Sequence, residues 1–314
     1  GLDRAAATGA GPRLEDEPRG RFVASAVNGL IGDRLLRERP ELAIPMALRR
    51  HGRDVPPERA ALAAAYPDAG GRLVVLLHGL CENESHWERH RDRTGTTYAE
   101  HLAARGWTPL FLRANSGLAL RENGVALSSL MQRVVEEWPT QVTRVALVGH
   151  SMGGLVLRAA GAVQAARPTG SRDWRALVTD VVTLGTPHLG APIAWGIGHG
   201  SRGLGVLPET AAFGRILDWR SQGVHDLVAG LSDDVPPLPH ARYRLVAATV
   251  TASARHPVGH LVGDLLVRPR SAHGRDRDGR TLFPDAEVLH VGRTDHLGLL
   301  NHPDVMTALE RWLG

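Results

Sequence analysis

The most reactive pattern in this chain of 314 residues is a serine between two glycines, Gly149-His150-Ser151-Met152-Gly153. The apolar residues 145–148 that precede it are typical of a buried parallel strand, and the apolar pattern of a helix begins at Leu155. In a sharp turn between a strand and a helix, the serine hydroxyl stands clear of the sheet and can attack a carbonyl carbon. The pattern therefore predicts that Ser151 is a nucleophile. The alternative is an ordinary serine in a turn.

A nucleophilic serine needs N–H donors for the negative oxygen that develops on the attacked carbonyl group. Upstream, the apolar residues 73–77 predict a second buried strand, which runs into the turn His78-Gly79-Leu80. We expect the backbone N–H groups of Leu80 and Met152 to form this oxyanion hole. We interpret the side chain of His78 as structural, packed or hydrogen-bonded beneath the loop.

The general base is expected on the loop between the last strand and the last helix. Residues 287–291 have the pattern of a strand, and His296 stands between them and an apolar helix pattern. The chain has 16 histidines, so a histidine alone is weak support. His290 lies within the predicted strand and His302 directly precedes Pro303 at a helix start, and both positions have structural explanations. We therefore assign the base to His296.

The acid that orients the base is predicted to be Asp264. It follows the predicted strand 243–250 and is flanked by apolar residues, so its carboxylate is expected to be buried. A buried carboxylate needs a partner, and an imidazole N–H can provide one. Residues 273–280 are polar and read as an exposed loop; their Asp-x-Asp-Gly core lacks the remaining ligands of a calcium loop, so we predict a turn and no metal. Three further aspartates are rivals for the acid: Asp276, Asp278 and Asp285.

These residues resemble the α/β-hydrolase superfamily and, within it, the bacterial lipase and PGAP-like serine esterase group. The resemblance covers roughly residues 70 to 314. The segments that carry it are His78-Gly79-Leu80, Gly149-His150-Ser151-Met152-Gly153-Gly154, Gly185-Thr186-Pro187-His188-Leu189-Gly190, Gly263-Asp264-Leu265-Leu266-Val267 and His296-Leu297-Gly298-Leu299-Leu300. The departure is Leu265, where the group usually carries glycine.

The resemblance implies an α/β-hydrolase fold, a mostly parallel sheet with helices on both faces. Alternating patterns place strands near residues 73–78, 108–113, 144–149, 181–185, 243–250 and 286–291, with helices between them. We expect one catalytic domain, 71–314, and a cap insertion at about 193–240, where the resemblance places it. Three tryptophans are candidates for the substrate pocket: Trp87, Trp195 and Trp219.

Residues 1–70 are expected to form an N-terminal extension. Its apolar residues recur at helical spacing over about 21–37 and predict an amphipathic helix whose apolar face docks on the domain. Peripheral contact with a membrane or a partner is the alternative for this face. Residues 42–55 predict a hairpin that turns at His51-Gly52, and Pro57 is expected to start a short helix that ends at Ala65.

The composition excludes several classes of protein. The net charge is only +4 and the arginines are interspersed with acidic residues, which argues against nucleic-acid binding. The single cysteine allows no internal disulfide, and no run of 18 apolar residues predicts a transmembrane segment. We therefore expect a cytoplasmic protein. Because the sequence begins with glycine, a removed signal peptide remains the alternative.

Together these patterns predict a serine carboxylic-ester hydrolase, an esterase or lipase, that forms an acyl-enzyme without metal or cofactor. The expected substrates are hydrophobic acyl esters, small molecules or lipids. Two other functions stay open. One is an acyltransferase or thioesterase with the same three residues, and the other is a catalytically silent binding protein of the same fold.

Overall fold

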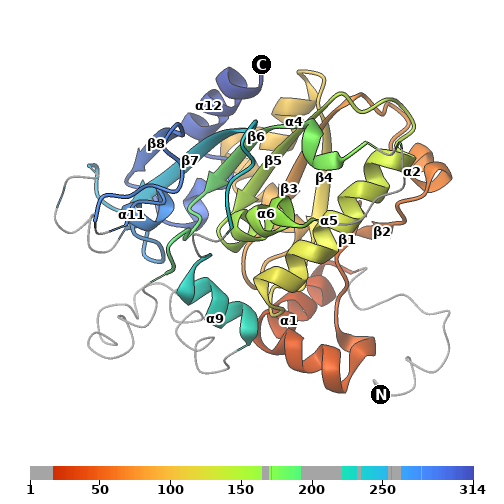
Figure 1. Cartoon of the computed structure of the whole chain (residues 1–314), viewed down its shortest axis with the longest axis horizontal. Coiled ribbons are helices and arrows are strands. Elements are labelled where there is room, and N and C mark those ends of the chain that lie inside the picture. Colours follow the sequence, from red (N-terminus) through yellow and green to blue (C-terminus); the bar gives the residue numbers. More distant parts are fainter. Residues whose placement is uncertain are drawn as a thin grey trace.

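The centre of the molecule is an eight-stranded sheet in the order β2-β1-β4-β3-β5-β6-β7-β8 (Figure 1). The computed structural model describes residues 17–164, 170, 172–191, 221–231, 235–253, 256, 263–276 and 278–314. The strands are β1 (Ala47–Arg50), β2 (Arg53–Val55), β3 (Arg72–Leu77), β4 (Thr108–Arg113), β5 (Arg144–His150), β6 (Val178–Leu184), β7 (Arg242–Thr249) and β8 (Glu287–Gly292). Strands β3 to β8 are parallel, and the six strands expected from the apolar runs are confirmed.

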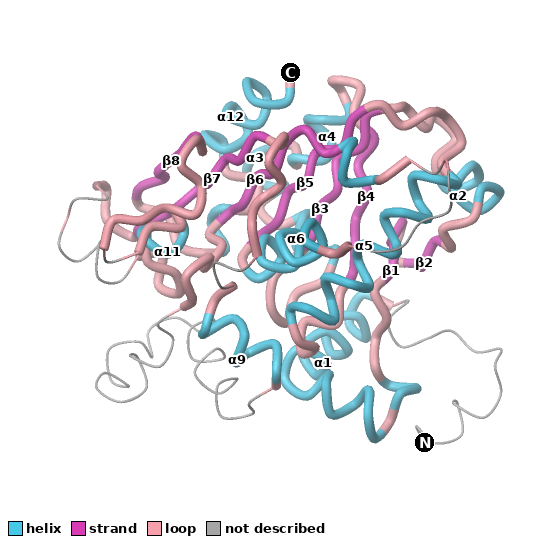
Figure 2. Tube along the Cα trace, in the orientation of Figure 1, coloured by secondary structure: helices cyan, strands magenta, loops and turns pink. Residues whose placement is uncertain are grey.

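Helices cover both faces of the sheet, as the alternation of patterns predicted (Figures 1 and 2). The main helices are α1 (Pro18–Glu38), α2 (Arg59–Ala65), α4 (Tyr98–Ala103), α5 (Leu120–Glu137), α6 (Met152–Ala162), α9 (Gln222–Ala229) and α12 (Pro303–Leu313). Shorter turns of helix are η2 (Pro40–Leu42), η3 (Glu84–Glu88), α3 (Arg91–Thr94), η4 (Trp174–Leu177), α11 (Pro269–Ala272) and η6 (Leu297–Leu299).

Side chains that alternate along the strands divide the core into two layers. Leu73, Val75 and Leu77 of β3 pack in one hydrophobic cluster with residues of α2, α5, α6 and α9. Val74 and Leu76 of the same strand pack in a second cluster with residues of α4 and α12. Because successive residues of a strand face opposite sides, a continuous apolar run is what a strand covered on both faces requires.

The predicted hairpin in the N-terminal extension is part of the same sheet. Strands β1 and β2 are antiparallel and turn at His51 and Gly52, which have φ of 49° and 76°. Strand β1 then pairs with β4, again antiparallel. The hairpin therefore extends the main sheet at its edge.

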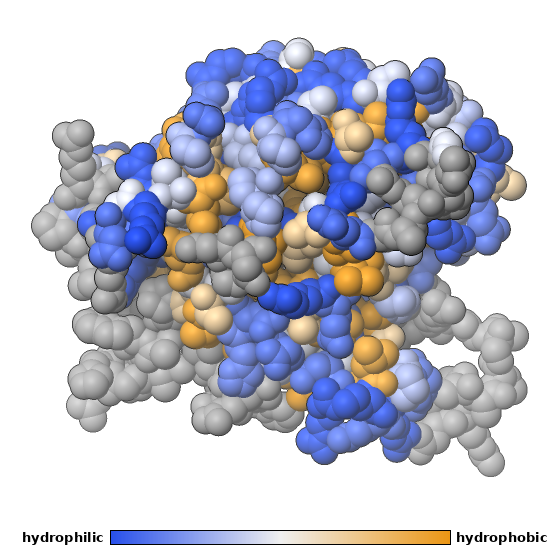
Figure 3. All heavy atoms as spheres, in the orientation of Figure 1, coloured by the Kyte–Doolittle hydropathy of each residue, from blue (hydrophilic) through white to orange (hydrophobic). Residues whose placement is uncertain are grey.

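The long helix α1 exists, but its predicted orientation is wrong. Phe22 and Val23 are about half exposed, whereas Ser25, Asn28 and Gly29 are buried. Glycine allows a close approach: a Cβ atom at Gly29 would lie 2.3 Å from Cys81 Sγ, and packing this tight stabilises the small-residue face against the domain. In Figure 3, hydrophobic (orange) and hydrophilic (blue) side chains lie side by side in the region of this helix.

Helix α9 is the described part of the segment expected to form a cap. It packs on α1, and the hydroxyl of Ser221 at its start donates a 2.8 Å hydrogen bond to the carbonyl oxygen of Gly29. Residues 193–220 and 232–234 of the expected insertion lie outside the described residues, and so do Trp195 and Trp219.

Candidate active site

The candidate residues lie on four loops that follow parallel strands. Leu80 follows β3, Ser151 follows β5, Asp264 lies on the loop after β7, and His296 follows β8. Parallel strands direct their carboxyl ends to the same edge of a sheet, which is where ligands bind in open α/β folds. The topology therefore brings residues that are up to 216 positions apart to one edge of the sheet.

The backbone of Ser151 is held in a strained turn between β5 and α6. Its φ of 52° and ψ of −124° are unfavourable for a residue with a side chain. The Ser151 N–H donates to Leu184 O at 2.8 Å, and Thr186 Oγ1 donates to Ser151 O at 2.9 Å. A Cβ atom at Gly153 would lie 2.3 Å from Leu77 O, so only glycine lets α6 start this close to β3.

His296 and Asp264 form a buried pair. The distance between His296 Nδ1 and Asp264 Oδ2 is 2.8 Å, and both residues are at most 4% exposed. The other carboxylate oxygen of Asp264 accepts the N–H groups of Leu266 and Val267, at 3.0 and 2.7 Å, which fixes the carboxylate. With Nδ1 donating to Asp264, the imidazole presents Nε2 as its basic nitrogen.

The pKa of His296 is raised above its usual value. Burial acts to lower this pKa, but the charge of Asp264 and the hydrogen bond to it outweigh burial, and Glu82 and Asp295 add to the increase. A carboxylate next to a buried imidazole favours the protonated form. His296 is thus a stronger base than an isolated histidine.

The turn after β3 lies against Ser151. A Cβ atom at Gly79 would be 3.0 Å from Ser151 Cβ. The N–H of Gly79 donates to Glu82 Oε2 and that of Cys81 to Ser116 Oγ, whereas the described residues offer no hydrogen-bond acceptor to the N–H of Leu80. Met152 is the first residue of α6, so its N–H has no acceptor within the helix. This geometry suits an oxyanion hole.

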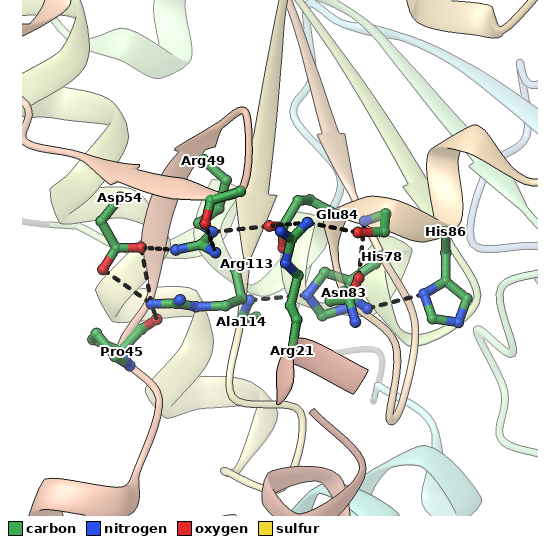
Figure 4. A network of polar contacts seen from close by, with 12 residues as sticks. Arg21, Pro45, Arg49, Asp54, His78, Asn83, Glu84, His86, Arg113 and Ala114 are labelled. Atoms are coloured by element: carbon green, nitrogen blue, oxygen red, sulfur yellow. Dashed lines mark hydrogen bonds and ion pairs between the residues drawn. The ribbon is translucent and has the colours of Figure 1, made fainter. Parts of the chain in front are cut away.

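The other histidines singled out in the sequence have structural contacts. His78 Nδ1 donates to Gly79 O at 2.9 Å, and its Nε2 accepts the N–H of Ala114 at 3.0 Å, so the ring links β3 to the end of β4 (Figure 4). This confirms the structural interpretation of His78. His290 contacts Thr249 Oγ1, and His302 caps the start of α12.

The rival aspartates differ in their surroundings from Asp264. Asp276 accepts the N–H groups of Asp278 and Arg280, which confirms the expected turn. Asp285 is exposed. Within the described part of the chain, no three His, Cys, Asp or Glu side chains are grouped so that they could hold a metal ion.

Two buried residues beside the candidate site were not singled out in the sequence. Glu82 lies on the loop after β3, and His150 directly precedes Ser151; their side chains are 3.0 Å apart. A histidine at the end of a buried strand is the signal that could have pointed to His150, whereas Glu82 begins the polar run Glu82-Asn83-Glu84 and no local pattern marks it.

Trp87 lies in the core, away from the surface. It is 1% exposed and packs with Tyr98 and Trp107 in the cluster between the sheet and helices α4 and α12. Its burial in this layer gives no support to a role in the substrate pocket.

Among the described helices, none has both the length and the apolar sequence that spanning a bilayer requires.

Comparison with known proteins identifies the fold. Residues 68–195 match a family model described as "Putative serine esterase (DUF676)". The mature form of the Bacillus licheniformis lipase BlEst2 aligns with a TM-score of 0.56 and 21% identity, over 78% of this chain and 93% of that chain. The propeptide form of the same lipase aligns with a TM-score of 0.54 and 21% identity, over 78% of this chain and 51% of that chain. Comparison with curated proteins gives no match. Sheet order, helical layers and this similarity together show that the chain has the α/β-hydrolase fold.

Proposed function

We propose that this protein is a serine carboxylic-ester hydrolase with Ser151 as nucleophile, His296 as general base and Asp264 as the residue that orients the base. The observation that carries the proposal is the strained turn of Ser151 at the same sheet edge as a buried, oriented imidazole. The match of residues 68–195 to a serine esterase model supports it.

In the first half of the reaction, His296 Nε2 takes the proton of the Ser151 hydroxyl as the oxygen attacks the ester carbonyl carbon. The carbonyl oxygen becomes negative and is stabilised by the N–H groups of Leu80 and Met152. The carbon–oxygen bond of the ester then breaks. The alcohol leaves with the proton that His296 returns, and the acyl group stays on Ser151.

In the second half, water replaces the alcohol. His296 Nε2 takes a proton from water, and the hydroxide attacks the acyl carbon. The tetrahedral intermediate collapses, the acid is released, and the proton returns to the oxygen of Ser151. Every step balances without a metal or a cofactor.

The acyl group of the substrate is proposed to be hydrophobic. Leu80 and Met152, which flank the proposed oxyanion hole, belong to the same hydrophobic cluster as Val224 and Leu227 of α9. An apolar environment beside the nucleophile favours burial of an acyl chain over a polar group.

The test is hydrolysis of p-nitrophenyl esters from acetate to palmitate by the wild type and by Ser151→Ala. We expect the substitution to lower kcat by several orders of magnitude, since no other group supplies the nucleophile. A matched control is Ser128→Ala. It removes another buried serine hydroxyl, one that contacts Trp174 Nε1 and lies on α5, and it should keep wild-type activity per folded molecule.

Near-native turnover in Ser151→Ala would refute the proposed nucleophile. A strong preference of the wild type for an alcohol or thiol acceptor over water would identify an acyltransferase instead. Failure of Ser151 to react with a fluorophosphonate would identify a silent binding protein. An optimum at acetate would contradict the hydrophobic acyl group.

A further inference from the structure

We propose that Glu82 and a doubly protonated His150 form a buried ion pair that positions His296 and the oxyanion loop relative to Ser151. This inference rests on the proposed function, because it assigns positioning residues to that reaction. Neither residue touches the reacting atoms in the mechanism above.

The pair joins three of the four loops of the candidate site. Glu82 Oε2 accepts the N–H of Gly79 at 2.8 Å, directly before Leu80. The same oxygen is 3.0 Å from His150 Nδ1. On the other side of the ring, His150 Nε2 is 3.1 Å from the backbone oxygen of His296. A single chain of contacts therefore runs from the oxyanion loop, through the residue before Ser151, to the proposed base.

The partners of His150 determine its protonation. A carbonyl oxygen can only accept, so Nε2 must donate to His296 O. Oxygen Oε2 of Glu82 also accepts the Gly79 N–H, a contact that favours the ionised carboxylate, and an ionised carboxylate can only accept, so Nδ1 donates as well. His78 provides the contrast, because its two nitrogens face one acceptor and one donor and a neutral ring satisfies both. His150 faces two acceptors and needs both protons.

Both side chains of the pair are shielded from water. His150 is fully buried and Glu82 is 7% exposed. Burial alone would raise the pKa of Glu82, but the His150 charge and hydrogen bond, with His86 and the Gly79 N–H, hold it below its usual value. An imidazolium next to a carboxylate is electrically neutral as a pair, so it can be buried where a single charge cannot.

The pair acts on His296 through its backbone. The rings of His150 and His296 are 4.8 Å apart, so a shift of the first moves the peptide that carries the second. The charge of Glu82 also contributes, after that of Asp264, to the raised pKa of His296, which Asp295 faces as well. Misplacement of a reacting group by about 1 Å costs roughly 100-fold in rate.

The first experiment is ¹⁵N NMR of the histidine rings in the wild type without substrate. We expect one ring, absent in His150→Gln, to carry a proton on both nitrogens at pH 8, where a model imidazole is neutral. A singly protonated His150 at pH 8 would overturn the proposal. This readout depends neither on turnover nor on the folding of a Glu82 variant.

The second experiment compares Glu82→Gln, His150→Gln and the double variant on one p-nitrophenyl ester. We expect each single variant to lower kcat by roughly 10- to 100-fold with little change in KM, and the double variant to be no worse than the poorer single one. Independent, multiplying losses would refute the pair.

Glu84→Gln is the matched control, since Glu84 is a second buried acid on the same loop. Its carboxylate binds Arg49 at 2.9 Å and Arg21 at 3.4 Å, on the side that faces the hairpin (Figure 4). We expect reduced stability, an unchanged kcat and an unchanged His150 signal. Ser151→Ala in the same series separates the two ideas: full activity there refutes the proposed function, whereas Ser151-dependent activity that Glu82→Gln leaves intact refutes only the positioning role.

Discussion

Two buried aspartates lie at opposite edges of the parallel part of the sheet. The partners of one are arginines, and the partner of the other is a histidine. Asp180, near the start of β6, is fully buried and contacts Arg144 and Arg244. Asp264, on the loop after β7, is 1% exposed and contacts His296. Burial and a hydrogen-bonded partner therefore do not distinguish a structural acid from a candidate catalytic one.

The difference lies in what the partner can do. Arginine keeps its proton at every relevant pH, so the cluster around Asp180 does not exchange a proton near neutral pH and only stabilises the fold. Histidine gains and loses a proton near neutral pH, so Asp264 controls which nitrogen of a titrating group is basic. The amino-terminal edge of this sheet is thus electrostatically fixed, and the carboxyl-terminal edge can take part in proton transfer.

The largest effect is expected for Asp264→Asn. The amide oxygen can still accept the N–H groups of Leu266 and Val267, but the amide nitrogen donates to His296 Nδ1 and forces the tautomer that carries its proton on Nε2. We expect kcat to fall by roughly four orders of magnitude, with the free energy of unfolding changed by about 1 kcal/mol or less. Steady-state kinetics and urea unfolding check this. An active Asp264→Asn would return Asp276 and Asp285 to consideration.

Asp180→Asn should show the reverse behaviour. It leaves the buried guanidinium of Arg244 without its counter-charge, and Arg144 is only 20% exposed, so we expect a loss of about 3 kcal/mol in the free energy of unfolding. The activity per folded molecule should stay at the wild-type value, because the substitution lies at the far edge of the sheet. An Asp180→Asn variant that keeps its stability but loses its activity would contradict the assignment of a structural role to the amino-terminal edge and of proton transfer to the carboxyl-terminal edge.

The two edges should also respond to pH in different ranges. His296 must be neutral at Nε2 to act as a base, and its pKa is raised above 6.5, so the inflection of kcat/KM should lie above pH 6.5, with activity falling as pH falls through it. The same shift contributes stability that is complete below pH 6.5 and lost as pH rises through the folded pKa.

Asp180 contributes in the opposite range. Burial acts to raise its pKa, but Thr179, Arg144 and Arg244 hold it below 3.8, so its stabilisation is present above that pH and lost as pH falls below it. Burial, with Arg275 and His290, lowers the pKa of His273 to about 4, so this residue costs stability as pH falls below 6.5. A kcat/KM profile reports on His296, and urea unfolding of the wild type and of Asp180→Asn at pH 5 and pH 3 reports on Asp180. An activity inflection below pH 6.5 would contradict the raised pKa of His296.

Much of this arrangement could be predicted from the sequence, for a physical reason. Strands β3 to β7 contain short apolar runs because both of their faces are covered, whereas the edge strand β8 is mostly exposed or half-buried, and the candidate residues stand where the strands stop. Chain order and the parallel topology then bring Leu80, Ser151, Asp264 and His296 to one edge. No knowledge of side-chain contacts was needed for this step.

The rest depends on contacts between segments far apart in the chain. The apolar spacing of α1 predicts a helix but not the face that it buries. Gly29 approaches Cys81, and Gly32 approaches Asn115, more closely than any larger residue could. This close packing of the glycine face turns Phe22 outward. Glu82 and His150 are 68 residues apart, and each has an ordinary local interpretation until their side chains are seen to meet.

The smallest effect is expected at Leu265, the residue after Asp264, which has φ of 82°. This sharpens the comparison of the two aspartates, because Asp180 lies in a regular strand. A left-handed conformation costs a residue with a Cβ atom about 1 kcal/mol relative to glycine. Leu265→Ala keeps this strain and loses the partly buried side chain, whereas Leu265→Gly loses the side chain and the strain together. We therefore expect the glycine variant to be more stable than the alanine variant by about 1 kcal/mol, the reverse of their order where φ is negative. Urea unfolding of the two variants measures the difference. If alanine were the more stable, Leu265 would not be strained, and the geometry of the Asp264 loop would have to differ from the one described.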